Sequence, residues 1–262
     1  MRLLRSSLSG TLAAGLLCLA TACHADEPVP DREALPELGL MGTIPIYWGE
    51  AGDFGDVLAG GESAHWARVQ LEAGYRLSPL DTLDEPSLAR IDFLLLAQPR
   101  ALSPGENVAL DAWVRGGGRL LLFADPMLTG ESRFAIGDRR RPQDVILLSP
   151  ILDHWGLALA FDEDRPAGLA VVRAGGAAIP VNLPGSIDVG GGEADCAIIV
   201  PEVLAECRIG RGSALVLADA ALLDLHEPHP GAAAALDWLA ARAFAIGGDH
   251  AGQGLSGRAS AQ

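Results

Sequence analysis

IDFLLLAQPRALSPGENVALDAWVRGGGRLLLFADP, residues Ile91–Pro126, predicts a strand, a helix and a second strand in succession. The runs Ile91–Ala97 and Leu120–Ala124 are short and almost wholly apolar, which is typical of strands covered on both faces in a parallel sheet. Between them, a helical pattern extends from Pro104 to about Arg115. A strand, a helix and a strand in this order form a βαβ crossover, so the sequence predicts an α/β fold.

Residues with a local structural role mark both ends of this helix. Ser103 precedes Pro104, and Glu106 follows three positions after the serine. This spacing predicts a capping box, and proline is favoured at the first helical position because it has no N–H to leave unpaired. Gly116–Gly118 ends the helix and precedes a strand, which is the reverse of the order in a phosphate-binding loop.

Helix and strand patterns continue on both sides of this unit. We expect a single α/β domain over residues 42–246. A β-rich insertion is expected at about residues 168–209, where short β-type runs alternate with Gly, Pro and Asn turns. The other predicted elements are strands at Gly42–Trp48 and Ala214–Ala218 and helices at Glu62–Ala73, Asp144–Trp155 and Gly231–Ala245.

The first 22 residues have the features of a signal peptide: two arginines, an apolar run and then small residues. The segment closes with Ala20-Thr21-Ala22-Cys23, which is similar to a bacterial lipobox, so Cys23 is predicted to become the lipidated first residue. The alternative is ordinary signal-peptidase cleavage, after Ala22 or after Ala25. Both interpretations predict an exported, periplasmic protein. The Pro- and acid-rich residues 23–41 predict an extended linker, and the Gly-rich residues 247–262 a disordered tail.

The charge of the chain excludes two classes of partner. The formal net charge is −15, and the sequence contains no lysine. Binding of nucleic acid needs clustered cations, and so does docking on an anionic membrane surface. Beyond the signal segment no apolar run reaches the roughly 20 residues that a membrane span requires. Contact with a membrane is therefore expected only through a lipid anchor.

The mature chain keeps two cysteines within the predicted domain, Cys196 and Cys207. In an oxidising compartment such a pair predicts a disulfide. The alternative is a redox pair, but the spacing is not Cys-x-x-Cys.

Two segments are similar to a known family. The first contains DFLLLAQP followed by LSPGENVALDAWVRGGGRLLLFADP, and the second contains GRGSALVLADAALLD and GAAAALDWLA. Both resemble the periplasmic auxiliary domain of uncharacterised ABC-type transport systems, a family that includes gliding-motility auxiliary subunits. The resemblance covers about Thr43–Asp162 and Gly210–Arg242. It implies a flavodoxin-like parallel sheet flanked by helices, as in class I glutamine amidotransferases, and a partner in an envelope transport or assembly system.

The candidate ligand-binding residues follow from the predicted sheet, because open α/β sheets bind ligands beyond the carboxyl ends of their strands. An amidotransferase would place a cysteine on a sharp turn from strand to helix. The equivalent turn here, residues 98–101, has no Cys, Ser or Thr. We therefore expect no catalytic residue and no cofactor. The residues at the predicted strand ends are Trp48, Glu50, Gln98, Arg100, Asp125 and Asp219.

A second type of site is suggested by His226, Glu227 and His229, which lie in a Pro-containing loop near Asp219 and Asp224. Imidazole and carboxylate ligands suit zinc. The alternative is a solvent-exposed loop without a metal, because two histidines three positions apart across a proline do not share a helix face.

The main interpretation is a non-catalytic exported accessory domain that binds a partner protein or a small ligand in an envelope transport system. A second hypothesis is a periplasmic hydrolase or metal-dependent enzyme that uses the strand-end acids with the His226/His229 loop. A third is a structural lipoprotein without a ligand.

Overall fold

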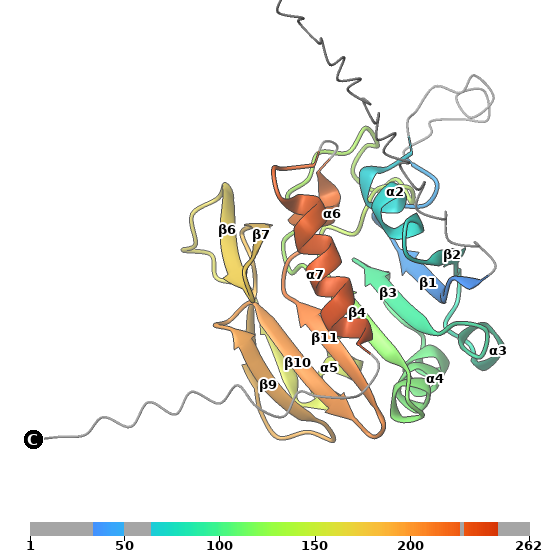
Figure 1. Cartoon of the computed structure of the whole chain (residues 1–262). Coiled ribbons are helices and arrows are strands. Elements are labelled where there is room, and N and C mark those ends of the chain that lie inside the picture. Colours follow the sequence, from blue (N-terminus) through green and yellow to red (C-terminus); the bar gives the residue numbers. More distant parts are fainter. Residues whose placement is uncertain (1–33, 50–63, 226–227, 246–262) are drawn as a thin grey trace, which may run out of the picture. The chain divides into compact units, whose positions relative to one another are not determined.

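The computed structural model of the chain describes residues 34–49, 64–225 and 228–245. The core of this part is a seven-stranded sheet (Figure 1). The first five strands across the sheet run parallel to one another, the sixth strand is antiparallel to the fifth, and the seventh is antiparallel to the sixth. In spatial order the strands are β2 (Arg76–Pro79), β1 (Glu37–Gly42), β3 (Phe93–Ala97), β4 (Arg119–Phe123), β11 (Gly212–Leu217), β10 (Leu204–Ile209) and β9 (Asp195–Val200).

Helices cover both faces of this sheet. Successive side chains of a strand point to opposite faces, and accordingly Leu95 and Leu121 belong to one buried cluster whereas Leu94 and Leu120 belong to another. The first cluster is completed by α2 (Trp66–Glu72), α6 (Ala221–Asp224) and α7 (Ala232–Phe244). The second is completed by α3 (Glu85–Leu88), α4 (Pro104–Arg115) and α5 (Ser149–Trp155).

The predicted crossover is confirmed. Strands β3 and β4 pair in parallel, with Leu94 opposite Leu120, and α4 connects them. Both halves of the capping box are present: the Ser103 side chain accepts a hydrogen bond from the backbone of Glu106, and the Glu106 side chain accepts one from the backbone of Ser103.

The predicted first strand, Gly42–Trp48, is wrong. The strand is β1, Glu37–Gly42, so it begins inside the segment expected to be a linker. Pro45 has no N–H to donate to a strand ladder, which explains why the run after Gly42 turns away instead of pairing. Gly42 serves close packing, because a Cβ atom there would lie 2.1 Å from the carbonyl oxygen of Ala97 on β3.

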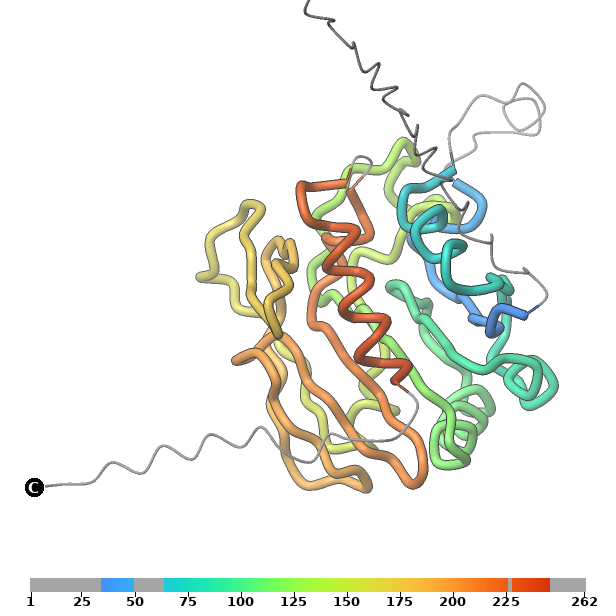
Figure 2. The backbone as a smooth tube through the Cα atoms, in the orientation of Figure 1, coloured from blue at the N-terminus to red at the C-terminus, as the bar shows by residue number. Residues whose placement is uncertain are grey.

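The predicted β-rich insertion is distributed over three sheets. β6 (Leu169–Ala174) and β7 (Ala177–Asn182) form a separate hairpin, and β8 (Ser186–Val189) pairs with β5 (Leu157–Ala160). β9 and β10 extend the main sheet beyond β11 (Figure 2).

Two further expectations can be compared with the structure. The helix expected from Asp144 begins only at Ser149, where Pro150 occupies its first turn. Cys196 and Cys207 lie opposite each other on β9 and β10, and a disulfide joins their sulfur atoms 2.01 Å apart. None of the helices in the described ranges has the length and apolar content that crossing a bilayer requires.

Candidate functional site

The carboxyl ends of the parallel strands meet at one edge of the sheet, where the sequence predicted a site. Gln98 follows β3 directly, Asp125 follows β4 after one alanine, and Asp219 follows β11 after one alanine. Because β3, β4 and β11 are neighbours in the sheet, the structure brings these three side chains to adjacent strand ends. We call Gln98, Asp125 and Asp219 the strand-end cluster.

Gln98 occupies the sharp turn between β3 and α4. Its φ angle is 48°, a left-handed conformation that is uncommon for a residue with a side chain. A nucleophile elbow uses a strained turn at this position to expose its reactive side chain. The Gln98 side chain instead points inward and is 0% exposed.

The Gln98 amide ties three segments together. Its Nε2 donates to the carbonyl oxygens of Asp125 (2.8 Å) and Gln143 (2.9 Å), and its Oε1 accepts from the backbone N–H of Asp125 (2.8 Å). The Gln98 carbonyl oxygen also accepts from Thr43 Oγ1 (2.5 Å), which in turn accepts from the Gln143 N–H (2.9 Å). These bonds hold the ends of β1, β3 and β4 to the loop that contains Gln143.

Asp125 is buried, with 1% of its surface exposed, and both carboxylate oxygens accept backbone hydrogen bonds. Oδ1 accepts from the N–H of Met127 (2.8 Å) and Oδ2 from the N–H of Ala220 (3.1 Å). Burial raises the pKa of Asp125 to about 6, because desolvation penalises the charged form more than these two bonds favour it.

Asp219 is fully buried beside Asp125 and is bonded in the same way. Its Oδ1 accepts from the N–H of Ala221 (2.7 Å) and its Oδ2 from the N–H of Asn182 on β7 (2.8 Å). Burial, followed by repulsion from the charge of Asp125, raises the pKa of Asp219 well above its usual range. The two acids therefore connect β4, β7, β11 and α6, and little of either carboxylate is accessible to a ligand.

Arg100 lies outside the strand-end cluster and is bound to the start of α4. Its guanidinium donates to both carboxylate oxygens of Glu106, at 2.7 and 3.0 Å, and to the carbonyl oxygen of Asp81 at 2.8 Å. The hydrogen bond from Arg100 is the main reason that the pKa of Glu106 falls to about 2. Arg100 thus completes the capping box that the sequence predicted.

Trp48 is the candidate that faces solvent, with 76% of its surface exposed. Its ring packs edge-on against Tyr47, with the ring centroids 4.8 Å apart. Arg68 of α2 holds Tyr47 in place, because its guanidinium lies 4.3 Å from the Tyr47 ring centroid and donates to the Tyr47 carbonyl oxygen at 2.6 Å. Glu50 lies outside the described residues.

The predicted metal loop is described only in part. His226 and Glu227 lie outside the described residues. The Nδ1 atom of His229 lies 2.9 Å from the carbonyl oxygen of Pro230. Within the described ranges, no group of three or more His, Cys, Asp or Glu side chains is arranged to hold a metal ion.

Sequence reasoning missed the partners of the strand-end cluster. Thr43, Gln143 and Asn182 are isolated polar residues in or next to turns, and no motif marks them. The signal that was available is the position of Gln98, a long polar side chain immediately after an apolar strand.

Several solved structures share low similarity with the chain. An exo-β-1,4-mannosidase from Opitutaceae bacterium strain TAV5 is 14% identical (TM-score 0.48; 79% of this chain and 36% of that chain covered). A β-galactosidase from Rahnella sp. R3 is 12% identical (TM-score 0.45; 79% and 31% covered). A ThuA-like protein from Bacteroides uniformis is 7% identical (TM-score 0.43; 80% and 92% covered). The chain thus spans about a third of the length of the two glycosidases. No curated protein sequence matches it.

The family comparison agrees with the resemblance seen in the sequence. The model described as an ABC-type uncharacterized transport system matches residues 60–164, a range that contains α2, β2, the crossover from β3 to β4, and α5. Residues 60–164 of the chain therefore match the model of the auxiliary family of ABC-type uncharacterized transport systems.

Proposed function

We propose that this protein is a non-catalytic exported accessory domain that binds a partner protein or a small ligand in an envelope ABC-type transport or assembly system. The match of residues 60–164 to the auxiliary family model supports the assignment to a transport system. The binding role is our inference from the strand-end edge.

One observation carries this proposal: the inward orientation of Gln98. The backbone of the turn has the strained conformation that an elbow needs, yet the side chain is buried and bonded to Asp125 and Gln143. Asp125 and Asp219 are likewise bonded to backbone N–H groups. A site whose polar side chains are already bonded internally is suited to holding loops in a fixed shape, and such loops can present a binding surface.

The surface we assign to the partner lies on these loops. Trp48 is 76% exposed beyond β1, and Ile136 is 88% exposed in the loop after β4. That loop is attached to the strand-end cluster, because the N–H of Ile146 donates to the carbonyl oxygen of Asp125 (3.1 Å). Large apolar side chains that remain exposed on fixed loops are typical anchors of protein interfaces.

Site-specific photocrosslinking in intact envelopes tests this proposal. A photoreactive amino acid at position 48 or 136 should crosslink to a protein of the transport system. Position 108 is the matched control, because Val108 is also well exposed but lies on α4. Equal crosslinking from all three positions, or none from 48 and 136, would contradict the proposed surface.

We further propose that the domain is flavodoxin-like, as the family resemblance implies. The support is the order of the five parallel strands, β2-β1-β3-β4-β11, which corresponds to the order 2-1-3-4-5 of that fold. An experimental structure in which β11 did not pair with β4 would overturn this assignment.

Export and lipid attachment at Cys23 are also part of the proposal, and this residue lies outside the described ranges. A Cys23→Ser variant should lose lipid labelling and membrane association. Unchanged labelling would exclude the lipoprotein.

A hydrolase or metal-dependent enzyme is the second candidate. The observation that favours it is the pair of buried acids with raised pKa values, Asp125 and Asp219, because perturbed acids are common in active sites. Metal analysis of the wild type and of a His226→Ala/His229→Ala variant tests this candidate. Stoichiometric metal in the wild type, together with its loss in the variant, would favour an enzyme over an accessory domain.

A further inference from the structure

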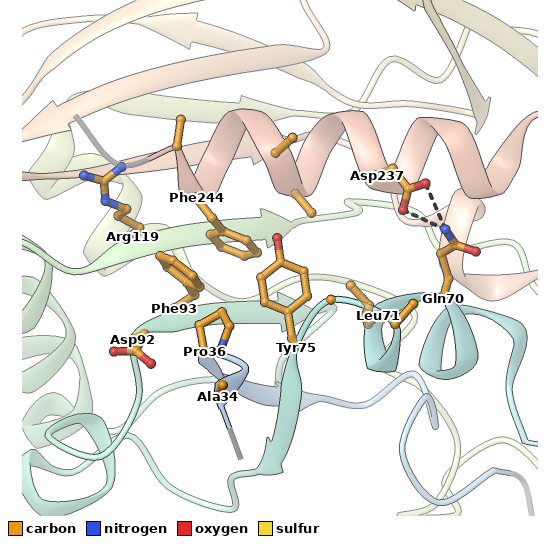
Figure 3. A pocket seen from close by; sticks show the side chains of 15 residues that line it. Ala34, Pro36, Gln70, Leu71, Tyr75, Asp92, Phe93, Arg119, Asp237 and Phe244 are labelled. Carbon is orange, nitrogen blue, oxygen red and sulfur yellow. Dashed lines mark hydrogen bonds between the residues drawn. The ribbon is translucent and has the colours of Figure 1, made fainter. Parts of the chain in front are cut away.

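A groove lies at the opposite edge of the sheet, where the parallel strands begin. Its volume is about 960 Å³, which is within the usual range for a small-molecule site. The walls come from the starts of β3 and β4, from the end of α2 and from α7 (Figure 3). It is separate from the strand-end cluster, so an inference about it goes beyond the proposed function.

Three aromatic rings lie at this groove: Tyr75 and Phe93 are half-buried, and Phe244 beneath them is buried, with 4% of its surface exposed. Phe93 and Phe244 stack with their centroids 4.8 Å apart, and Tyr75 meets both rings edge-on at 6.0 and 5.7 Å. Alanines of α7 extend this apolar surface. Aromatic rings offer a large, rigid contact area to an apolar ligand at a low cost in side-chain entropy.

One end of the groove carries the guanidinium of Arg119 together with the carboxylate of Asp92 (Figure 3), whose Oδ2 atom accepts from the N–H of Glu37 (2.8 Å). Arg119 lies beside Phe244 at this end (Figure 3). Within the described ranges, its guanidinium forms no hydrogen bond or ion pair with another group. An arginine that has no partner among the described residues and lies at the end of an apolar groove suits a carboxylate, which it can bind through two parallel hydrogen bonds.

The other end is anionic. Both carboxylate oxygens of Asp237 accept from Gln70 Nε2 at 2.8 Å. The amide of Gln70 orients the carboxylate but leaves its negative charge uncompensated. The hydroxyl of Tyr75 has no hydrogen-bond partner in the described part of the chain, and its pKa is raised by burial first and by the charge of Asp237 second. This end therefore suits an ammonium group.

The spacing of the two ends sets the length of the ligand. Asp237 and Phe244 are seven positions apart on α7, which corresponds to about 10 Å at the rise of an α-helix. An extended peptide advances roughly 3.3–3.6 Å per residue, so about three residues cover this distance. We propose that the groove binds short apolar peptides of about three residues, with the carboxylate at Arg119, the ammonium at Asp237 and the side chains on Tyr75 and Phe93.

Calorimetric titration of the full-length protein with trileucine tests this proposal. Two blocked forms of the same peptide are matched probes: the C-terminal amide removes the carboxylate, and the N-acetyl form removes the ammonium. We expect each block to weaken binding about tenfold, which corresponds to the loss of one charge-assisted contact.

Variants assign each charge to its end of the groove. Arg119→Met should weaken binding of free trileucine but not of the amide, and Asp237→Asn should weaken binding of the free peptide but not of the N-acetyl form. Arg173→Met is the matched control, because Arg173 is an exposed arginine on β6 that does not line the groove, and it should bind like the wild type.

Three results would overturn the proposal: no binding of trileucine, equal binding of the blocked and free peptides, or equal effects of the Arg119 and Arg173 substitutions. The peptide series needs no variant, so it remains decisive even if Arg119→Met does not fold. Photocrosslinking from position 48 reports on the other edge of the sheet, so failure of either proposal leaves the other intact.

Discussion

Lowering the pH from about 7.5 to 5 is expected to stabilise this protein, because Asp125 and Asp219 are buried and no cation of the described residues pairs with either acid. The pKa of Asp125 is about 6 in the folded protein and 3.8 in its ordinary environment. Between these two values the folded state binds more protons than the unfolded state. The free energy of unfolding therefore falls as the pH rises through this window, and it stops changing above the folded pKa.

The magnitude follows from the size of the shift. A difference of about two pKa units, at 1.36 kcal/mol per unit, corresponds to about 3 kcal/mol for Asp125 over the whole window. About 1.4 kcal/mol of this is recovered between pH 7.5 and pH 5. Asp219 acts in the same direction, because its pKa is also raised.

Other acids do not obscure this effect above pH 5. The pKa of Glu106 is lowered to about 2 by its bond with Arg100, and that of Asp138 to about 2 by its bond with Arg140. An acid whose pKa is lowered by folding contributes its full stabilisation above its unfolded pKa. That contribution to the free energy of unfolding is lost only as the pH falls through about 4 to 2. The free energy of unfolding should therefore be highest near pH 5.

Urea unfolding followed by tryptophan fluorescence at a series of pH values measures this dependence. In Asp125→Asn, one of the N–H groups of Met127 and Ala220 loses its acceptor, which should cost about 1–3 kcal/mol at pH 5. The difference in the free energy of unfolding between the variant and the wild type should become smaller towards pH 7, because only the wild type is destabilised by ionisation at position 125. Asp153→Asn, a substitution of an exposed acid on α5, should keep the wild-type profile. A wild-type stability that is constant or increases between pH 5 and 7 would refute the reasoning.

Three further predictions concern stability and share the same urea assay. Replacing both Cys196 and Cys207 by serine should cost about 3 kcal/mol, because the disulfide closes a loop with a sequence separation of 11; an unchanged midpoint would show that the bond is not formed. Gly42→Ala should cost about 1–3 kcal/mol, since the new Cβ would lie 2.1 Å from the carbonyl oxygen of Ala97, and a neutral effect would mean that β1 and β3 separate easily. Ser103→Ala should cost about 1 kcal/mol by removing the N-cap of α4, whereas Ser103→Asp, which keeps an acceptor, should cost less.

Much of the fold was predictable because its signals are local. The crossover from β3 to β4 depends on apolar runs, a capping box and a glycine stop, all of which act within a few residues of chain. The boundaries of α4 agree with the prediction for the same reason. The segment before Pro45 was misjudged because the Pro- and acid-rich composition of residues 23–41 was interpreted as an extended linker, and the first strand was placed after it. Gly39 and Gly42 lie within β1, where they allow close contact with neighbouring side chains and with β3.

The candidate site was predictable only in its position. The rule that strand ends meet at one edge correctly grouped Gln98, Asp125 and Asp219. Their burial could not be read from the sequence, because it depends on segments far away along the chain. Asp125 is bonded to Ala220, 95 positions later, and Asp219 to Asn182, 37 positions earlier.

The sequence by itself therefore determined the α/β class, the crossover and the identity of the residues at the strand ends, since these depend on local periodicity and capping. Only the tertiary structure decided which of those side chains face inward, that β11 lies between β4 and β10, and that a groove with opposite charges forms at the other edge. The physical reason is that the direction of a side chain and the environment of a charge are set by contacts between segments. No local pattern encodes which segments those will be.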